Sequence, residues 1–112
     1  MEQTTFAVGD DPKGIVVDFG QVWVANAGDD TVTTIRRGRP IRVGDKPRGI
    51  ASGFGSIWVT NGGDRSVSRI DPDTREVVQE LDVGRRPQGI AVGAGSVWVA
   101  NGGAGTVSRI EP

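Results

Sequence analysis

Cysteine and histidine are both missing from this sequence of 112 residues. Without cysteine, disulfide bonds and thiolate metal sites are excluded. Without histidine, the chain lacks the commonest general base and the commonest transition-metal ligand. We therefore expect no catalytic residues, no metal site and no cofactor, and we predict that the protein is not an enzyme.

An excess of charge of one sign and long hydrophobic runs are also missing. The 13 basic and 14 acidic side chains nearly cancel, so the composition indicates neither a nucleic acid nor a membrane surface as a partner. No apolar run approaches the roughly 20 residues that span a bilayer. The first five residues lack the basic start and apolar core of a signal peptide. We expect a soluble protein whose location stays open.

Glycine and proline, by contrast, are abundant and fall at regular places along the chain. They punctuate a short run of β-branched and aromatic residues that contains one tryptophan and ends in an asparagine turn. The tryptophans, Trp23, Trp58 and Trp98, follow one another at 35 and 40 residues. Such runs are typical of a buried strand followed by a tight reversal. The three copies are Gln21–Gly28, Ser56–Gly63 and Ser96–Gly103.

Each repeat divides into four short strands, and the repeats cover approximately residues 8–42, 43–82 and 83–112. Repeats of about 40 residues with several short strands are typical of β-propeller blades, and no stretch has the 3.6-residue period of a helical repeat. The sequence therefore predicts an all-β propeller fragment with three four-stranded blades. Besides the tryptophan runs, the expected strands are Gly14–Phe19, Gly49–Gly53 and Gly89–Gly93 (inner), Thr31–Arg36, Ser66–Asp71 and Thr106–Glu111 (third), and Pro40–Val43 and Glu76–Val83 (outer).

One further segment, Thr4–Val8, has the pattern of an outer strand and precedes the first repeat. Three blades are too few for a closed ring, which typically holds 4–8 blades, and an open arc exposes strand edges and apolar faces. We therefore expect two chains to join head to tail in a six-bladed homodimer, with a nine-bladed trimer as the less usual alternative. The expected inter-chain contacts are Thr4, Thr5, Phe6, Ala7 and Val8 of one copy with Val107 and Ile110 of the other.

Charge changes sign between equivalent loops of the first and third repeats. Asp10 and Asp11 in the first repeat correspond to Arg85 and Arg86 in the third. Because the third blade of one copy meets the first blade of the other in the expected dimer, these residues would face each other across the junction and influence docking orientation. Chance variation of surface charge is an equally good explanation.

In a propeller, the loops before the inner strands and after the tryptophan runs project on one face, near the mouth of the central channel. Binding residues concentrate on loops held by a rigid scaffold, so this face is the expected place for a small-molecule or ion ligand. Lys13, Arg48 and Gln88 occupy equivalent positions and could offer positive charge to an anion, although solvated turns are the commoner interpretation. The candidate ligand contacts are Lys13, Arg48, Gln88, Asn26, Asn61 and Asn101.

Three features have a structural interpretation that we favour over a functional one. The asparagines suit turns, because asparagine tolerates the left-handed backbone conformation. Asp10, Asp11, Asp29 and Asp30 lack the alternating spacing of a calcium loop and also suit turns. Each tryptophan is flanked by valine or isoleucine, which predicts a place in the core rather than a stacking platform for bases or sugars.

The third repeat, Pro87–Pro112, reads PQGIAVGAGSVWVANGGAGTVSRIEP. This pattern resembles the YVTN-type β-propeller repeats, and the resemblance covers essentially the whole chain, with departures at Asp18-Phe19-Gly20 and Thr33-Thr34. The repeats are also similar to those of streptogramin B lyases, a family implied to eliminate across an ester with histidines, a glutamate and magnesium. Because this chain has no histidine, that catalytic set has no positions to occupy, and we expect no lyase activity.

We therefore expect a self-assembling propeller half, excised or engineered, that acts as a structural scaffold. The alternative is a ligand-binding or sensor module that uses the loop face, because the resemblance implies such roles for receptor-kinase sensor domains and periplasmic binding proteins. A lyase-like enzyme with a metal held by loop carboxylates is the least favoured hypothesis.

Overall fold

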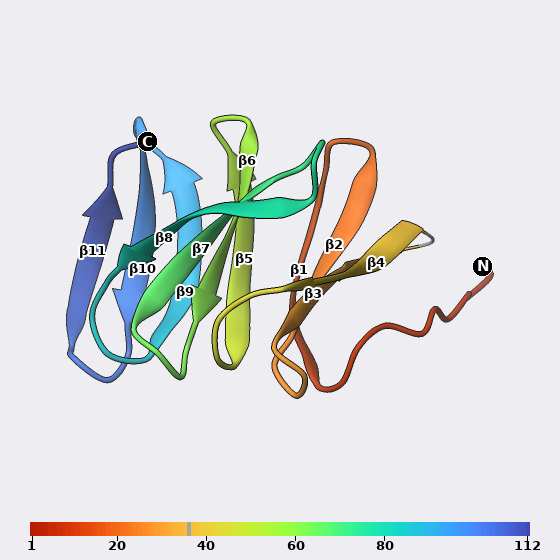
Figure 1. Cartoon of the computed structure of the whole chain (residues 1–112), viewed down its shortest axis with the longest axis horizontal. Coiled ribbons are helices and arrows are strands. Elements are labelled where there is room, and N and C mark those ends of the chain that lie inside the picture. Colours follow the sequence, from red (N-terminus) through yellow and green to blue (C-terminus); the bar gives the residue numbers. More distant parts are fainter. Residues whose placement is uncertain (36) are drawn as a thin grey trace.

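The computed structural model describes residues 1–35 and 37–112. These residues form eleven strands in three antiparallel sheets, with no helix among them (Figure 1). No segment of this part of the chain is therefore a helix long and apolar enough to cross a membrane.

Each sheet is a meander whose strands are neighbours in sequence order. The first sheet contains β1 (Pro12–Asp18), β2 (Gln21–Asn26), β3 (Thr31–Thr34) and β4 (Arg37–Arg42). The second contains β5 (Pro47–Gly53), β6 (Ser56–Asn61), β7 (Ser66–Asp71) and β8 (Glu76–Asp82). The third contains β9 (Pro87–Gly93), β10 (Ser96–Asn101) and β11 (Thr106–Ile110).

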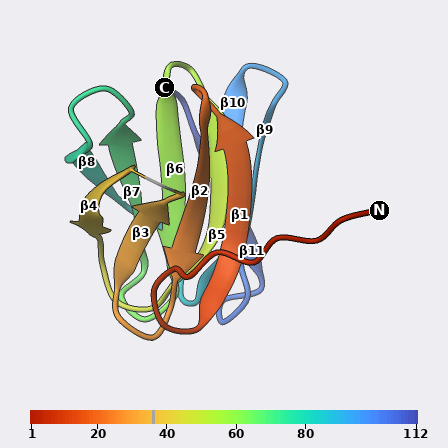
Figure 2. The same cartoon turned by 90° about the vertical axis from the view of Figure 1, so that its right-hand side faces the viewer.

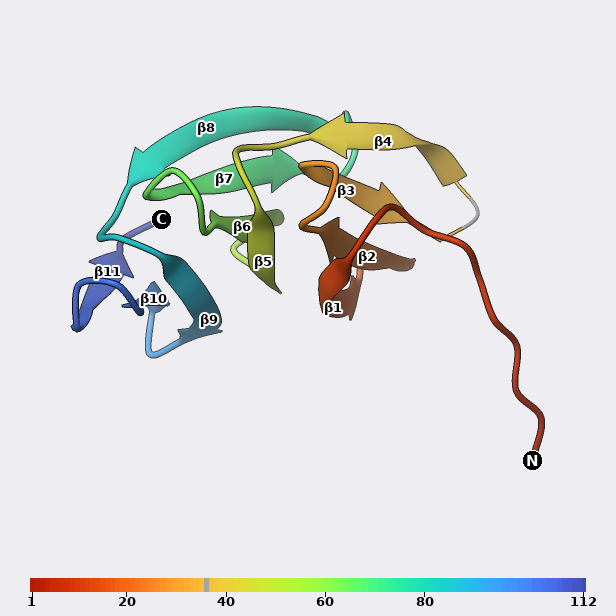
Figure 3. The same ribbon diagram turned by 90° about the horizontal axis from the view of Figure 1, so that it is seen from below.

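The three sheets stand side by side in an arc. Seen from below in Figure 3, the inner strands β1, β5 and β9 lie along one side of the arc, and the outer strands β4 and β8 lie along the other. Neighbouring inner strands approach each other closely. A side chain at Gly14 would clash with the carbonyl oxygen of Arg48, and a side chain at Gly49 would clash with the carbonyl oxygen of Gln88. Glycine at these two positions therefore permits the tight spacing of the blades.

Two hydrophobic cores fill the spaces between the sheets. Trp23 of β2 is fully buried against the second sheet, and Trp58 of β6 is fully buried against the third. Successive side chains of a strand point to opposite faces, so the residues on either side of each tryptophan pack in the opposite direction. The first core contains Trp23, Ala25, Val32, Ile41, Ile50, Ile57, Val59 and Ile70, and the second contains Trp58, Val67, Val97, Val99 and Ile110.

The first and third sheets each leave an apolar face uncovered. Ile15 and Val17 of β1 are 67% and 72% exposed, whereas Ile50, the equivalent of Ile15 in β5, is 9% exposed. Val107 of β11 is 65% exposed, whereas its equivalent in β7, Val67, is fully buried. Figure 2 looks onto the first sheet and shows β1 facing outward with no other sheet before it. The contrast in exposure thus follows from position in the arc, because the residue types are nearly the same.

The twelfth expected strand, Thr4–Val8, is not formed within the chain. Residues 1–11 carry no strand and lead away from the first sheet (Figures 1 and 3). The third sheet has three strands, because β11 lacks the outer neighbour that β4 and β8 provide in the other sheets. Since β11 and residues 4–8 lie at opposite ends of the arc, one chain cannot pair them, and strand exchange between copies stays a prediction.

The turn between β3 and β4 is tighter than the sequence suggests. β3 ends at Thr34, and the expected end of this strand at Arg36 lies outside the described residues. β4 begins at Arg37 rather than at Pro40, because Thr34 pairs with Arg37 beyond an irregularity in the register after Val32.

One side chain from the second sheet reaches the first. Arg75, in the turn between β7 and β8, donates hydrogen bonds to the Thr34 hydroxyl (2.7 Å) and to the Arg39 carbonyl oxygen (2.8 Å). Its guanidinium carbon lies 5.8 Å from the centroid of the Trp23 ring. Arg75 therefore connects the outer parts of two neighbouring blades.

Candidate functional site

The three asparagines predicted as ligand contacts are interior residues. Asn26 and Asn61 are fully buried and Asn101 nearly so. In the second blade, Asn61 Nδ2 donates hydrogen bonds to the hydroxyls of Ser66 (3.0 Å) and Ser68 (2.9 Å), and the amides of the other two asparagines make the equivalent bonds in their own blades. The asparagines therefore join the second strand of each blade to the third. This burial corrects their assignment to an exposed ligand face.

Replacing Asn61 by alanine is expected to lower the free energy of unfolding by about 1–3 kcal/mol. The change removes one partner of each of two serine hydroxyls, and it removes the acceptor of the Gly44 amide, which donates to Asn61 Oδ1 at 3.1 Å. Urea denaturation followed by circular dichroism measures the loss. The control is Glu111→Ala at an exposed position, where a change below about 0.5 kcal/mol is expected. Equal stability of the two variants would contradict a structural role for Asn61.

The tryptophans connect strands within each blade. The indole Nε1 groups of Trp23, Trp58 and Trp98 donate to carbonyl oxygens at the end of the preceding strand, at 3.0, 2.9 and 2.9 Å. Trp23 and Trp58 have no exposed surface, while Trp98 is half-buried because no further sheet covers β10. This placement leaves no row of exposed rings on which bases or sugars could stack.

The remaining predicted ligand contacts, Lys13, Arg48 and Gln88, lie close together. They line one shallow cavity of about 420 Å3, with glycines and isoleucines of β1, β5 and β9. Lys13 also forms an exposed ion pair with Asp11, at 3.4 Å. The cavity follows the inner strands β1, β5 and β9, and ligand binding by these three residues stays a prediction.

A larger cavity, of about 810 Å3, lies between the loops of the second and third sheets, and we call it the basic pocket. Backbone hydrogen bonds hold these loops, since the Gly62 amide donates to the Lys46 carbonyl (2.9 Å) and the Gly102 amide donates to the Arg86 carbonyl (2.8 Å). Five basic side chains and no acidic one line the pocket. The lining residues are Lys46, Arg48, Gly62, Gly63, Arg65, Arg85, Arg86, Gln88 and Gly103.

The sequence pattern alone does not identify most of the basic pocket. It does not select Lys46 or Arg65, and it assigns Arg85 and Arg86 to a junction between chains. The repeat alignment compares equivalent loops of different blades, whereas the pocket joins non-equivalent loops of two adjacent blades. Adding the charges of the 44–49, 61–65 and 84–89 loops would have revealed this concentration of positive charge.

The acidic residues of the first blade serve the turns. Asp29 accepts hydrogen bonds from the Asp10 amide (3.2 Å) and the Thr31 hydroxyl (2.6 Å), and Asp30 accepts one from the Lys46 amide (2.9 Å). Across the described residues, no group of three or more potential metal ligands is found. Hydrogen bonds to the Thr31 hydroxyl and to the amides of other loops therefore explain the carboxylates of Asp29 and Asp30.

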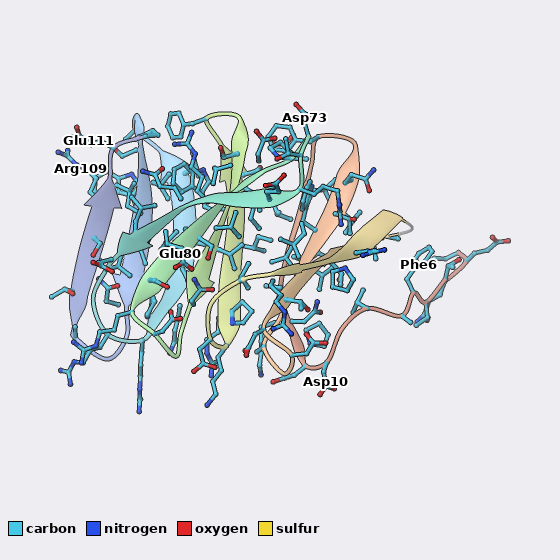
Figure 4. All side chains as sticks on the ribbon, in the orientation of Figure 1. Phe6, Asp10, Asp73, Glu80, Arg109 and Glu111 are labelled. Atoms are coloured by element: carbon cyan, nitrogen blue, oxygen red, sulfur yellow. The ribbon has the colours of Figure 1, made fainter. Side chains whose placement is uncertain are left out.

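The charged residues predicted to meet at the chain junction lie at opposite ends of the arc. Asp10 and Asp11 precede β1, and Arg85 and Arg86 precede β9. Figure 4 shows Asp10 at the lower edge of the first sheet. A contact between the two charged sets therefore requires a second copy of the chain and stays a prediction.

No protein-family model and no curated protein matches the chain, but several solved structures have a similar fold. Glutaminyl cyclase from Myxococcus xanthus is 15% identical, with a TM-score of 0.68, over 90% of this chain and 48% of that one. Hydrazine synthase from Kuenenia stuttgartiensis is 18% identical, with a TM-score of 0.70, over 96% of this chain and 37% of that one. A streptogramin B lyase is 18% identical, with a TM-score of 0.69, over 92% and 41%.

These similar proteins have the β-propeller fold, and this chain spans less than half the length of each. At such low identities the similarity concerns the fold alone, and some of these proteins are enzymes. The chain is therefore built of β-propeller repeats, arranged as three successive blades of which the third has three strands.

Proposed function

We propose that the chain is a self-assembling scaffold module, in which two copies join head to tail and close a six-bladed propeller. The uncovered faces carry this proposal, because each repeats a face that is buried inside the chain. Ile15 corresponds to the buried Ile50, and Trp98 corresponds to the buried Trp58. A second copy would therefore reproduce contacts that the two cores already contain, with burial of apolar surface as the driving force.

The open edge of β11 supports the same arrangement. In the second sheet, Val67 of β7 pairs with Leu81 of the outer strand β8. By repeat spacing, Val107 is the equivalent of Val67, and Phe6 is the equivalent of Leu81. In the proposed ring, Phe6 of one copy covers Val107 of the other, and no unpaired sheet edge of this kind is left in water.

The charges at the two ends of the arc are complementary. In the basic pocket, the loops before β5 and β9 share one cavity, so loops in these positions are neighbours when two blades pack. In the ring, the Arg85–Arg86 loop of one copy has the same relation to the Asp10–Asp11 loop of the other. The chain junction then pairs unlike charges, which favours head-to-tail docking over other orientations.

The molecular mass in solution tests the proposal. Sedimentation equilibrium of the full chain should give twice the 11.8 kDa mass of one chain. A mass of 11.8 kDa that persists up to high micromolar concentration would contradict the ring. A mass three times that of one chain would contradict the dimer and indicate the nine-bladed trimer instead.

Exchanging charges tests the junction itself. We expect the double variant Asp10→Arg/Asp11→Arg to weaken dimerisation by about tenfold at low salt, because exposed pairs contribute about 0–1 kcal/mol each. The backbone should tolerate the change, since Asp11 and Arg86 share a left-handed φ of 52° and 51°. Adding Arg85→Asp and Arg86→Asp to the same chain should restore affinity, measured as the dimer dissociation constant. If the quadruple variant dimerised as weakly as the double variant, the two loops would not lie opposite each other at the junction as proposed.

A further inference from the structure

The basic pocket gathers five cations, and none of them belongs to an ion pair within the described residues. In the described part of the protein, the ion pairs are Lys13–Asp11 and Arg109–Glu111, and neither involves the pocket. Two carboxylates belong to the same loops. Asp64 accepts hydrogen bonds from the Asp45 amide (3.0 Å) and the Ser66 hydroxyl (2.6 Å), and the Asp45 carboxylate lies where a side chain at the lining residue Gly63 would be. Figure 4 shows nitrogen-tipped side chains projecting from the lower edge of the second and third sheets.

The turn geometry does not require these cations. Lys46 and Arg65 have left-handed φ values of 52° and 55°, and the equivalent residues of the first blade, Asp11 and Asp30, have 52° and 58°. Gly105, the equivalent of Arg65 in the third blade, has a φ of 67°. Since the same backbone accepts an aspartate or a glycine, the fold does not account for the positive charge at these positions.

We propose that the basic pocket binds a compact polyphosphate anion, meaning a small molecule with several phosphate groups. Four of the five cations are arginines, whose planar guanidinium groups donate pairs of hydrogen bonds to phosphate oxygens. The volume of about 810 Å3 lies within the range of roughly 300–1,000 Å3 that is typical of small-molecule sites, and it exceeds the space that one phosphate fills.

The lining also limits the rest of the ligand. The pocket has basic side chains, one glutamine and three glycines, with no aromatic or aliphatic side chain. Recognition of a base requires an aromatic or apolar surface for stacking, which this lining does not offer. The ligand is therefore recognised through its phosphates, and its remaining part is small and polar.

Isothermal titration calorimetry of the full chain with sodium tripolyphosphate tests this proposal. We expect one site per chain, with an affinity that falls as ionic strength rises. The double variant Arg48→Gln/Arg65→Gly should bind at least about tenfold more weakly. It places in the second blade the residues that the third blade has at these positions, Gln88 and Gly105, so the fold should be retained.

The matched control is Arg39→Gln/Arg42→Gln, which removes two exposed cations of β4 outside the pocket. This variant should bind tripolyphosphate as the unaltered chain does. An equal loss of tripolyphosphate affinity in the two double variants would overturn the assignment of the ligand to the basic pocket, because it would indicate attraction by net charge alone. No binding by the unaltered chain, or equally tight binding of citrate, would overturn the assignment of a phosphate ligand.

All the lining residues belong to one chain, but Arg85 and Arg86 are also proposed to face Asp10 and Asp11 of a second copy. The site is therefore also tested in a chain that cannot form the ring. The full-length variant Phe6→Asp, which is designed to prevent assembly, should retain tripolyphosphate binding. Binding that is lost in this variant would overturn the assignment of the site to the loops of one chain. A chain that binds tripolyphosphate but stays monomeric would contradict the scaffold proposal alone.

Discussion

Replacing Phe6 by aspartate is expected to convert the proposed dimer into a monomer at micromolar concentration. Phe6 is 42% exposed in the single chain and has the repeat position of Leu81, which pairs with Val67 inside the second blade. A buried aromatic anchor at an interface typically contributes about 2 kcal/mol or more, so affinity should fall at least about thirtyfold. Sedimentation equilibrium measures the change.

The neighbouring residue provides a control of equal charge. The equivalents of Thr5 in the other outer strands are Pro40 and Glu80, and both are exposed. The side chain of Thr5 is therefore expected to face water in the ring, and Thr5→Asp should leave the mass unchanged. If Phe6→Asp and Thr5→Asp assembled equally well, the exchanged strand would not be the contact that closes the ring.

Replacing Trp58 by alanine is expected to cost about 3–5 kcal/mol in the free energy of unfolding. This is a large part of the roughly 5–15 kcal/mol that stabilises a typical domain. The indole is fully buried between the second and third blades, donates to the Gly53 carbonyl at 2.9 Å, and lies beneath the Arg69 guanidinium at 4.6 Å. Guanidinium denaturation followed by circular dichroism gives the loss as a lower midpoint of unfolding.

Trp98 is the matched comparison, because it has the same place in a strand and the same indole bond, to the Gly93 carbonyl at 2.9 Å. In the Phe6→Asp background, which is designed to be monomeric, Trp98→Ala should cost clearly less than Trp58→Ala, since no further blade covers Trp98. If the two substitutions cost the same in that background, burial by the next blade would not be the source of the stability. In an assembled ring, the two costs should become similar.

The local structure follows closely from the sequence. The expected inner strand Gly49–Gly53 lies within the observed β5, Pro47–Gly53, and the expected outer strand Glu76–Val83 exceeds β8 by one residue. Alternation of side chains and glycine or proline turns depend on residues that are close in the chain, so they can be recognised without the fold. The bulged pairing that starts β4 at Arg37 is different, because it depends on contacts across the hairpin.

The candidate site is less accessible to such reasoning. Lys13, Arg48 and Gln88 come together as the repeat alignment predicts, since equivalent positions of adjacent blades are neighbours. The asparagines do not join them, because their amides turn inward to hydroxyls of the next strand. Sequence position identifies a turn residue, but it does not show which way the side chain points.

By itself, the sequence determined the repeats and the strands β1 to β11, because each depends on a pattern that recurs every 35 or 40 residues. The tertiary structure alone decided which faces are buried and which charges are neighbours. Which side chains are buried and which charges are neighbours depends on the contacts between blades, so the equivalent valines Val67 and Val107 are 0% and 65% exposed. For the same reason, the cations from three separate loops form one pocket only where the second and third blades pack together.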